Sequence, residues 1–521
     1  KPVHYTQQPS LLGKAVDSSK PLLLTPMIQN GDVDAARGAA EVLIDGVSYG
    51  FSGYLSVPSA SGKRTNHMWF WYQPCQNCEH GKANFLQYFA GGPGSGSQGP
   101  AFNEIGRFQA FSAKELIQSC FSWCLENDCL FVDNPVQAGL SYQVDEDGDF
   151  PGLDNVEFTS SSEEATKQTL GVLLQFLELF PELKPAPYWI TGESYAGNYC
   201  PWMAKAVIEH NAAAVQGDNK VNLKGLSVAD PCLGWSVQME HYAQTLWTMG
   251  FLMEDEKCKV AQVVEDALSE LKNNDCPAFF KHWNSIWNDD GTSDVFLYKQ
   301  YSGSEATDNQ LLGGGRDAMS NYQEWLLQHS TVMHFAGSPA FVEGSKAEGG
   351  LGEWMTKCRK SIYQAMVESG DFCQETAPMY FVDLFLKVGI DVNIYSSNLD
   401  ALLGPPTTEP GIRAGLEAAG LKTKFYSMNK TIWKASALSK QPVGYGRCME
   451  GSKGNRFCYT IIRNAGHETP TYQAASAYDM TKRFIMGKPF DDTYHDPDIP
   501  QCTAEASTFA VSLAGYNITN K

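Results

Sequence analysis

Long apolar runs and basic residues are what this chain of 521 residues most clearly lacks. No apolar stretch reaches the length needed to cross a bilayer, so we expect no membrane-spanning helix. Lys and Arg together number 39 against 59 for Asp and Glu, which gives a net charge of -20 at pH 7. Such a surface repels phosphate groups, so neither nucleic acid nor anionic membranes are expected as partners.

The sequence also lacks a complete metal-binding pattern. Cys75-Gln-Asn-Cys78 has the spacing of half a zinc site, but no second pair accompanies it, so disulfides are the better interpretation. Another disulfide is expected to join Cys448 to Cys458 across a hairpin. The acidic segment Gln143–Asn155 resembles a calcium loop, yet no Glu stands at its twelfth position, which favours a solvated loop.

Cysteine usage points to an oxidising compartment. The 14 cysteines are even in number and scattered, and glycosylation sequons begin at Asn429 and Asn517. The chain opens at Lys1 without the apolar core of a signal peptide, which we interpret as a signal already removed. These features predict a secreted glycoprotein or a vacuolar or lysosomal one, and a cytosolic enzyme with free thiols is the alternative.

Alternating strand and helix patterns predict an α/β fold with a mostly parallel central sheet flanked by helices. The expected strands are Glu41–Val47, Gly50–Val57, His67–Gln73, Asn84–Phe89, Cys129–Val132, Tyr188–Thr191, Leu223–Val228, Val388–Ser396, Lys422–Met428 and Phe457–Arg463. The expected helices are Ser160–Leu179, Ala196–Ile208, Gly411–Gly420 and Tyr472–Met486.

The alternation stops between residues 232 and 383, where the sequence is helical and rich in aromatic residues. We interpret this stretch as an inserted cap because strand patterns resume after it, and a separate domain is the alternative. The predicted organisation is an N-terminal arm (1–40), a first core part (41–231), the cap (232–383), a second core part (384–490) and a tail (491–521).

One stretch combines a strand, a tight turn and a helix. Tyr188–Thr191 is apolar and β-favouring, and a helical pattern begins at Ala196. Between them, Gly192 and Ala196 supply the small residues that such a turn needs on either side of Ser194. The turn would present the Ser194 hydroxyl beside the N–H groups that open the helix, as a nucleophile requires.

A serine hydroxyl needs a base, and the base needs an acid to orient it. Asp400 and His467 each follow a predicted buried strand, in the chain order of an α/β hydrolase. A loop Asp or a lone His is usually structural, but the combination with Ser194 predicts a catalytic triad.

Five motifs make the chain resemble the serine carboxypeptidases, acid-active α/β hydrolases that include carboxypeptidase Y. The motifs are Phe51-Ser-Gly-Tyr-Leu55, Gly91-Gly-Pro-Gly94, Phe131-Val-Asp-Asn-Pro135 with Gly139-Leu-Ser-Tyr142, Gly192-Glu-Ser-Tyr-Ala-Gly197, and Ala465-Gly-His467 with Pro470. The resemblance implies that Ser194 attacks the carbonyl, that His467 moves the proton and that Asp400 orients the imidazole. It implies no cofactor, and peptide or protein C-termini as substrates.

The resemblance also implies binding roles. The N–H groups of Gly92 and Tyr195 would form the oxyanion hole. Glu104 and Glu193 would share a proton and, with Gly91, hold the substrate's C-terminal carboxylate, which predicts activity that is best in acid. Residues near the leaving group would include Tyr88 and Glu468.

The sequence departs from the family pattern in the glycine loop. Ala90 replaces an asparagine that helps to hold the carboxylate, and Ser95 replaces a cysteine. Glu468 follows His467 where methionine is common, and an acid there would favour a basic leaving group. These changes keep two alternatives open: a carboxypeptidase-like esterase, amidase or acyltransferase, and a non-catalytic binding protein. The oligomeric state and the residue preferences are not determined by the sequence.

Overall fold

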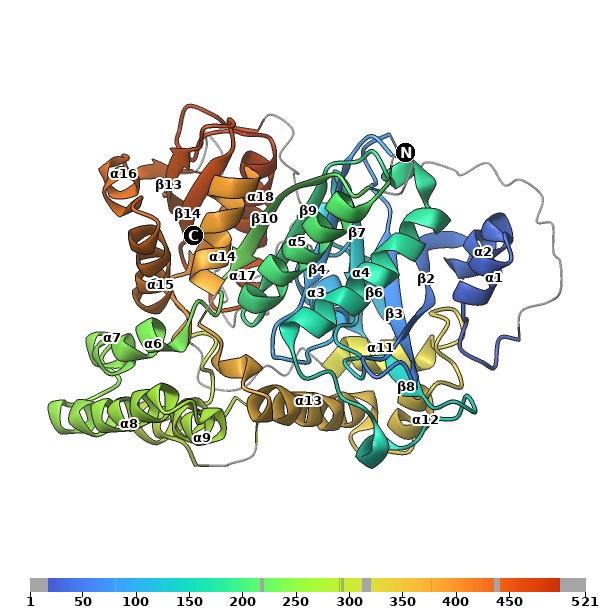
Figure 1. Cartoon of the computed structure of the whole chain (residues 1–521), viewed down its shortest axis with the longest axis horizontal. Coiled ribbons are helices and arrows are strands. Elements are labelled where there is room, and N and C mark those ends of the chain that lie inside the picture. The colour runs from blue at the N-terminus through green and yellow to red at the C-terminus, as the bar shows by residue number, and fades with distance from the viewer. Residues whose placement is uncertain are drawn as a thin grey trace, which may run out of the picture. The chain divides into compact units, whose positions relative to one another are not determined.

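The computed structural model describes residues 17–496, apart from residues 80, 216–219, 290, 292–294, 312–319, 376 and 435–440. The chain forms two compact units. The first comprises Lys1–Ile190, Trp202–Lys224 and Met319–Ile362, and the second comprises Thr191–Pro201, Gly225–Ala318 and Tyr363–Lys521. Many elements of both units are labelled in Figure 1.

The first unit is built on antiparallel strands that end in a parallel pair. Their order is β1 (Glu41–Ile44), β2 (Val47–Pro58), β3 (Thr65–Gln73), β7 (Asn127–Val132) and β4 (Asn84–Phe89). Strand β4 is parallel to β7, and the short β8 (Tyr142–Val144) pairs with β3. A two-stranded sheet of β5 (Phe108–Ser112) and β6 (Glu115–Gln118) lies apart from these strands.

Aromatic packing joins helix α4 (Ser162–Leu179) to this sheet. Phe176 is fully buried, and its ring lies 5.1 to 5.7 Å from the rings of Phe70, Tyr72 and Phe85. Burying one such ring stabilises the fold by about 1.5–3 kcal/mol. Ser161 caps the helix by accepting a hydrogen bond from the N–H of Glu164.

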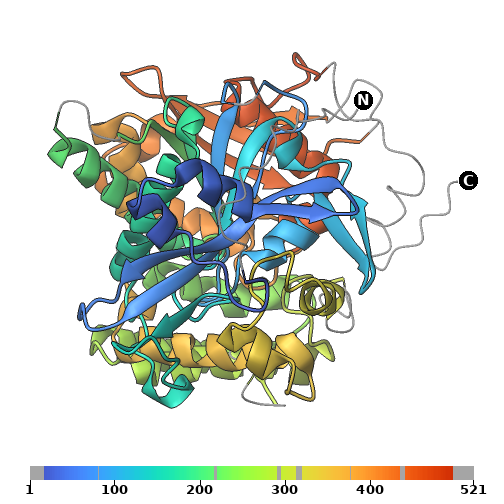
Figure 2. The same cartoon turned by 90° about the vertical axis from the view of Figure 1, so that its right-hand side faces the viewer.

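The remaining helices of the first unit are short, and two of them lie beside strand β2. They are α1 (Thr25–Gln29), α2 (Val33–Ala40), α3 (Gln98–Asn103), α11 (Ser320–Gln328) and α12 (Pro339–Gly344). Figure 2 shows α1 and α2 in dark blue next to the long blue strands β2 and β3.

The second unit holds parallel strands in its centre. Their order is β10 (Leu223–Ala229), β11 (Asp391–Ser397), β14 (Arg456–Ile462), β13 (Gly444–Glu450) and β12 (Thr431–Trp433). β10, β11 and β14 are parallel, whereas β13 and β12 are antiparallel to their neighbours. The α/β class is therefore confirmed, with a sheet that mixes parallel and antiparallel strand pairs.

Helices account for most of residues 232–383, as the sequence predicts. Those in the second unit are α6 (Trp235–Gln238), α7 (Tyr242–Thr248), α8 (Glu254–Lys272), α9 (Cys276–Trp287), α10 (Leu297–Ser302) and α14 (Ala377–Asp383). Helices α8 and α9 run side by side (Figure 1). The core part that follows contributes α15 (Pro405–Ala418), α16 (Lys422–Ser427), α17 (Thr469–Tyr472) and α18 (Ala474–Ile485).

Four elements contribute residues to both units. They are strand β9 (Tyr188–Glu193), helix α5 (Ala196–Ala213), strand β10 and helix α13 (Gly350–Glu368).

One predicted strand is wrong. Lys422–Met428 alternates like a strand, but the structure has helix α16 there, with Phe425 as its one buried side chain. A six-residue segment with one buried side chain can form a short helix or a strand. The spacing of its apolar residues therefore does not distinguish the two. Helix α15 also begins at Pro405 rather than Gly411, because prolines are accepted in the first helical turn.

Disulfides follow the sequence prediction where it was specific. Cys75 is bonded to Cys78, and Cys448 is bonded to its cross-strand partner Cys458. Two further bonds join Cys124 to Cys129 and Cys276 to Cys373. Among the described residues, no helix combines the length and apolar character that crossing a membrane requires.

Candidate active site

Strand β9 turns directly into helix α5, and Ser194 lies at the apex of the turn. All of β9 is buried, and Ser194 has a positive φ of 60°. The Ser194 N–H donates to the Ala229 carbonyl at 2.9 Å, and the Ser194 carbonyl accepts from Cys232 at 2.9 Å. These bonds hold a backbone conformation that is costly for a residue with a Cβ. The predicted strand–turn–helix context of Ser194 is therefore present.

Close packing also requires a glycine at position 197, the second residue of helix α5. A Cβ on Gly197 would lie 2.3 Å from the Cys232 carbonyl oxygen. The helix therefore approaches the backbone after β10 more closely than any larger residue would allow. The turn pattern predicts small residues only at Gly192 and Ala196, so Gly197 is an additional requirement of the structure.

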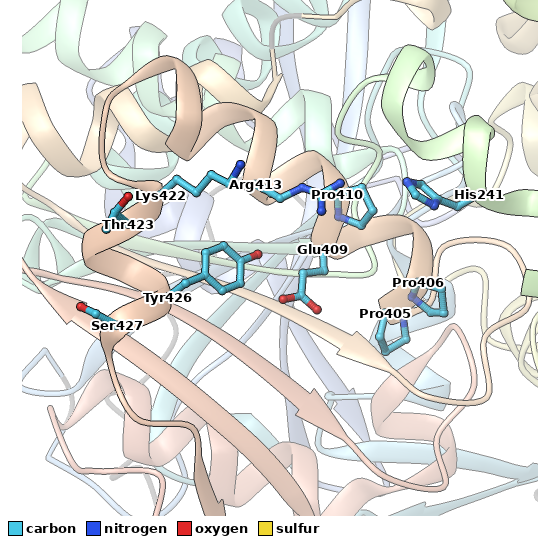
Figure 3. Close-up of a pocket in the computed structure, with 10 residues that line it drawn as sticks. All are labelled: His241, Pro405, Pro406, Glu409, Pro410, Arg413, Lys422, Thr423, Tyr426 and Ser427. Atoms are coloured by element: carbon cyan, nitrogen blue, oxygen red, sulfur yellow. The ribbon is translucent and has the colours of Figure 1, made fainter.

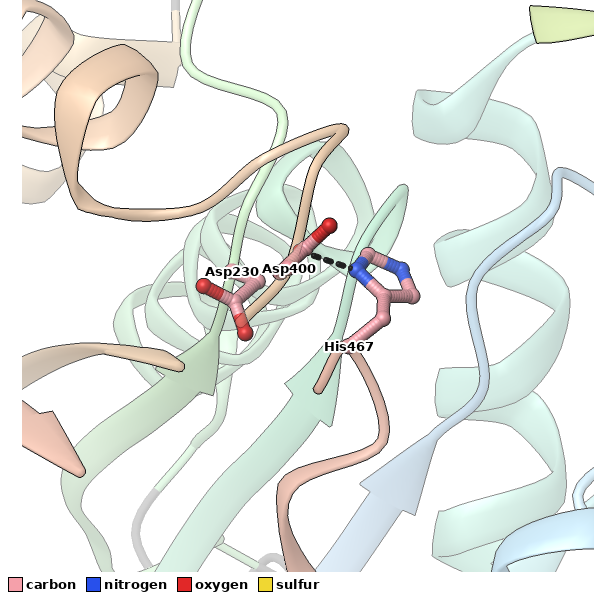
Figure 4. A group of neighbouring side chains, drawn as sticks. All are labelled: Asp230, Asp400 and His467. Atoms are coloured by element: carbon pink, nitrogen blue, oxygen red, sulfur yellow. Dashed lines mark hydrogen bonds and ion pairs between the residues drawn. The ribbon is translucent and has the colours of Figure 1, made fainter. Parts of the chain in front are cut away.

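Asp400 and His467 meet at the carboxyl ends of β11 and β14. His467 Nδ1 lies 2.6 Å from Asp400 Oδ2 (Figure 4). The other carboxylate oxygen of Asp400 accepts hydrogen bonds from the N–H groups of Leu402 and Leu403, at 2.8 and 3.1 Å. Asp400 is almost completely buried, and contacts to both of its carboxylate oxygens fix the orientation of the side chain.

Backbone hydrogen bonds connect the loops that carry these residues. The Asp230 N–H donates to the Tyr395 carbonyl of β11 at 2.8 Å. The Leu399 N–H, just before Asp400, donates to the Ala465 carbonyl at 2.8 Å, two residues before His467. The strand ends therefore form one hydrogen-bonded edge that sets the separation of the side chains.

A segment from residues 304 to 311 braces the same loops. The His467 N–H donates to the Asp308 carbonyl at 2.7 Å, and the Ala401 N–H donates to the Thr307 carbonyl at 3.3 Å. The Asp308 side chain accepts a short hydrogen bond from the Tyr472 hydroxyl, in helix α17. Sequence patterns do not predict this brace, because it joins residues that are far apart in the chain.

Asp230 is a further acidic residue beside the pair, and the sequence analysis missed it. Its carboxyl is fully buried at the end of β10 and lies next to Asp400 and His467 (Figure 4). One ligand-type atom from each of the three residues lies within 4.8 Å of the others. An Asp directly after a predicted buried strand was the available signal, the same one that identified Asp400.

The three groups could supply a metal with ligands, but their bonding favours proton chemistry. His467 Nδ1 already contacts an Asp400 oxygen at hydrogen-bond distance, which leaves that nitrogen no room for an ion. A neutral imidazole that donates from Nδ1 keeps its lone pair on Nε2, where a general base needs it.

Charge and burial act against each other on His467. Burial lowers the pKa of the imidazole, whereas the adjacent Asp400 raises it. Asp230 and Glu193 raise it further, and the net pKa of His467 is about 10. Burial and the charge of Asp400 raise the pKa of Asp230 well above its usual value.

The glycine loop of the first unit is anchored to Asp133, at the end of β7. Asp133 accepts hydrogen bonds from the backbone N–H of Ser97 and of Leu140, both at 2.8 Å, and a short one from the Gln98 side chain. Within the loop, Gly92 has a φ of 109°, and a Cβ there would lie 2.8 Å from the Gly94 nitrogen. Only glycine therefore suits this position.

The two glutamates predicted to share a proton are both buried. Glu104 lies in the first unit, where the Tyr88 hydroxyl donates to its Oε2 at 3.3 Å. Glu193 ends strand β9 in the second unit and acts electrostatically on His467. The pairing of Glu104 with Glu193 stays a prediction.

Tyr195, the residue after the serine, is fixed by the region between 232 and 383. Its hydroxyl donates to Asp371 at 2.7 Å, and its ring stacks on Phe372 at 5.9 Å. Phe372 in turn contacts the rings of Trp235 and Trp283. The Tyr195 backbone is thereby held in place by an aromatic cluster.

The remaining predicted residues are Glu468, Gly91 and the two sequons. Glu468 and Gly91 adjoin His467 and Gly92 in the sequence. Asn429 is exposed after helix α16, as glycosylation requires, and Asn517 lies outside the described residues.

An open pocket of about 790 Å³ lies between helices α15 and α16 (Figure 3). Its lining residues are His241, Pro405, Pro406, Glu409, Pro410, Arg413, Lys422, Thr423, Tyr426 and Ser427. None of them is a predicted site residue, and charges of both signs lie in the lining.

Comparisons with known proteins agree with this geometry. The model of the family described as serine carboxypeptidase matches residues 47–487. The venom serine carboxypeptidase of Apis mellifera is 27% identical over 479 residues, which are 91% of this chain and 92% of that protein. The probable serine carboxypeptidase CPVL of Homo sapiens is 26% identical over 481 residues, 91% of each protein.

A solved structure shows the same fold. The prohormone-processing carboxypeptidase KEX1(delta)p of Saccharomyces cerevisiae matches with a TM-score of 0.60 and 18% identity, over 84% of this chain and 92% of that one. The fold is that of the α/β hydrolases, and because the family model spans most of the sequence, this chain belongs to the serine carboxypeptidase family.

Proposed function

We propose that this protein is a serine carboxypeptidase that releases C-terminal residues from peptides, best in acid, through an acyl-enzyme on Ser194. The observation that carries the proposal is the 2.6 Å contact between His467 and buried Asp400, in the same unit as the Ser194 turn. Family membership narrows the reaction class from serine hydrolase to carboxypeptidase.

In the proposed reaction, His467 removes the proton of Ser194 as the hydroxyl oxygen attacks the scissile carbonyl. The imidazolium then protonates the departing amino acid, and a water molecule, activated by the same imidazole, hydrolyses the acyl-enzyme. Asp400 keeps the proton of the neutral imidazole on Nδ1 and stabilises the imidazolium that forms.

Two sets of groups surround this chemistry in the proposal. The N–H groups of Gly92 and Tyr195 stabilise the oxyanion, which is where such donors contribute most. Glu104, Glu193 and Gly91 bind the substrate's carboxylate, and Tyr88 and Glu468 line the leaving-group side.

Acid favours this mode of carboxylate binding. Two buried carboxyls that lie close together cannot both ionise without repulsion, so one keeps its proton at a pH where an isolated Glu would be charged. A protonated Glu104 or Glu193 donates a hydrogen bond to the substrate carboxylate, whereas an ionised pair repels it. We therefore expect peptidase activity to fall as the pH rises from 4 to 8.

The proposed setting is a secretory, vacuolar or lysosomal compartment. The disulfides found among the described residues and the exposed sequon at Asn429 suit an oxidising environment. A relative named for venom and another named vitellogenic carboxypeptidase, from Aedes aegypti, support secretion. Peptide and protein C-termini are the proposed substrates.

The test offers one peptide as free acid, C-terminal amide and methyl ester between pH 4 and 8, and measures release of the last group. We expect the free acid to be preferred at low pH and the preference to vanish as the glutamates ionise. The variant Ser194→Ala should release nothing from any of the three, which excludes a contaminating peptidase.

Ala90 supports the second candidate, a carboxypeptidase-like esterase, amidase or acyltransferase. Its buried side chain cannot donate the hydrogen bond that an asparagine would supply to the carboxylate. Such a charge-assisted bond is worth about 1.5–3 kcal/mol. Equal or faster turnover of the amide and ester, without a preference for acid, would favour this candidate over the carboxypeptidase.

A further inference from the structure

Asp230 lies beside Asp400 and His467 and holds the loop that carries Asp400. Its two carboxyl oxygens accept the backbone N–H of Ser397, at 3.0 and 3.2 Å. Ser397 ends strand β11 and begins the loop that carries Asp400. The carboxyl of Asp230 therefore anchors that loop, while its own N–H is fixed to β11 through Tyr395.

Asp230 and Asp400 form a pair of buried carboxyls around one imidazole. Both are at most 1% exposed, and their oxygens lie within 4.8 Å of each other and of a His467 nitrogen. At this separation and burial, two negative charges repel strongly, so one carboxyl keeps a proton. Asp400 is the one that His467 contacts directly, so Asp400 carries the charge and Asp230 the proton.

Proton transfer in the proposed reaction favours the same assignment. Asp400 and Asp230 both raise the pKa of His467, and Asp400 does so more strongly. An imidazolium cannot accept the proton of Ser194. A neutral Asp230 no longer favours the imidazolium, so Asp400 is then the carboxylate of this pair that acts on the ring.

Other charged and titratable groups act on His467, Asp230 and Asp400 from neighbouring elements. Glu193, at the end of β9, also raises the pKa of His467, but less than Asp230 does. Tyr459 of β14 faces Asp230, and burial raises the pKa of this tyrosine far above the working range. Tyr242 and Tyr298 face Asp400 and likewise have raised pKa values, so these phenols stay neutral.

We propose that Asp230 is a positioning residue that shares one proton with Asp400: it anchors the Asp400 loop and can itself supply the anion when Asp400 is neutralised. The inference rests on the proposed triad of Ser194, His467 and Asp400 and adds a fourth group to it.

A double-mutant cycle tests this sharing. The rate at which a fluorophosphonate labels Ser194 is measured at pH 6 for the wild type, Asp230→Asn, Asp400→Asn and the double variant. We expect Asp230→Asn to slow labelling less than tenfold, because an amide keeps the neutral, hydrogen-bonding form. In the Asp400→Asn background, where Asp230 becomes the only triad anion, the same change should cost a further thirtyfold or more.

A purely structural anchor would give the same loss in both backgrounds, and that additive result would overturn the proposal. Asp391→Asn is the matched control, because Asp391 is a carboxyl that accepts the Arg456 N–H at the opposite end of β11. Its effect should be equal in both backgrounds. Thermal melting verifies folding, and Asp230→Ser completes the cycle if Asp230→Asn does not fold.

Labelling does not depend on recognition of a C-terminal carboxylate, so it separates this inference from the proposed function. A wild-type protein that takes no label would overturn the triad and the inference together. If the wild type is labelled but the effects of Asp230→Asn and Asp400→Asn on the labelling rate simply add, the inference alone is overturned. The comparison of peptide, amide and ester would then still test the proposed function.

Discussion

Gly92 and Ser194 both hold a positive φ, and each does so at a point where the backbone is expected to meet the substrate. Strain of this kind persists only where the surroundings enforce it. Ser194 is held by hydrogen bonds to the backbone after β10, and Gly92 lies in a loop held by Asp133. Single-residue changes at these positions should therefore affect activity more than stability.

Gly92→Ala tests the oxyanion role. The new Cβ would lie 2.8 Å from the Gly94 nitrogen and 2.9 Å from the Ser95 nitrogen, so the loop has to shift and the Gly92 N–H with it. Removing one oxyanion donor costs about 10²–10³ in kcat, and we expect a loss of that size in peptide hydrolysis.

The matched control is Gly62→Ala, at a turn with a φ of 70° and nothing within 4 Å of the added Cβ. The Gly62→Ala variant introduces a similar backbone strain at a position outside the predicted site. Comparable losses of kcat for Gly62→Ala and Gly92→Ala would argue that strain alone, and not the oxyanion hole, explains the result.

At the scale of elements, strand β2 is joined by a histidine to the chain that follows helix α11. His334 Nδ1 lies 3.0 Å from the carbonyl oxygen and from the hydroxyl of Ser52. Burial lowers the pKa of His334 to about 4. The folded state therefore keeps this ring neutral at a pH where the unfolded chain binds a proton.

This linkage predicts a loss of stability in acid. The folded pKa lies below the unfolded value of about 6.5, so the stabilisation is complete above pH 6.5 and is lost as the pH falls toward 4. The free energy of unfolding should fall by up to about 3 kcal/mol through this residue.

His334→Asn should remove most of that dependence. Asparagine can donate to the Ser52 carbonyl in place of Nδ1, does not titrate, and tolerates the φ of 62° at this position. We expect the melting temperature of the variant to change less between pH 7 and pH 4 than that of the wild type. Parallel melting curves would show that His334 does not control acid stability.

The elements also show what could be predicted from the sequence. The Ser194 turn was correctly predicted because its small residues, strand and helix are all local. Asp400 and His467 were found because each follows a strand. Asp230 has the same local signature, but its importance depends on β10 lying next to β11, an adjacency that strand patterns alone do not specify. Helix α16 was mistaken for a strand because one buried residue does not define a period.

At the scale of the whole molecule, the disulfide between Cys276 and Cys373 closes a loop with a sequence separation of 97. The bond between Cys448 and Cys458 spans only 10 positions. In the loop-entropy account, the first stabilises by about 4.7 kcal/mol and the second by about 2.7 kcal/mol.

Replacing each pair by serine tests this difference. The Cys276→Ser, Cys373→Ser variant should lose more unfolding free energy than the Cys448→Ser, Cys458→Ser variant, as measured by denaturant unfolding. The short hairpin bond serves as the control for loss of a disulfide as such. A larger loss for the hairpin pair would contradict the entropic account and indicate that local packing dominates.

The brace at residues 304–311 limits which sequences can replace this part of the chain without moving Asp400 and His467. Its backbone contacts both the loop that bears Asp400 and the backbone of His467. Regions inserted into a hydrolase core are often regarded as exchangeable modules that change specificity and leave the chemistry alone. Here residues 304–311 share hydrogen bonds with the loops of Asp400 and His467. A chimera that replaces the predicted insertion, residues 232–383, must therefore retain Thr307 and Asp308, or their geometry, if His467 is the base that we propose.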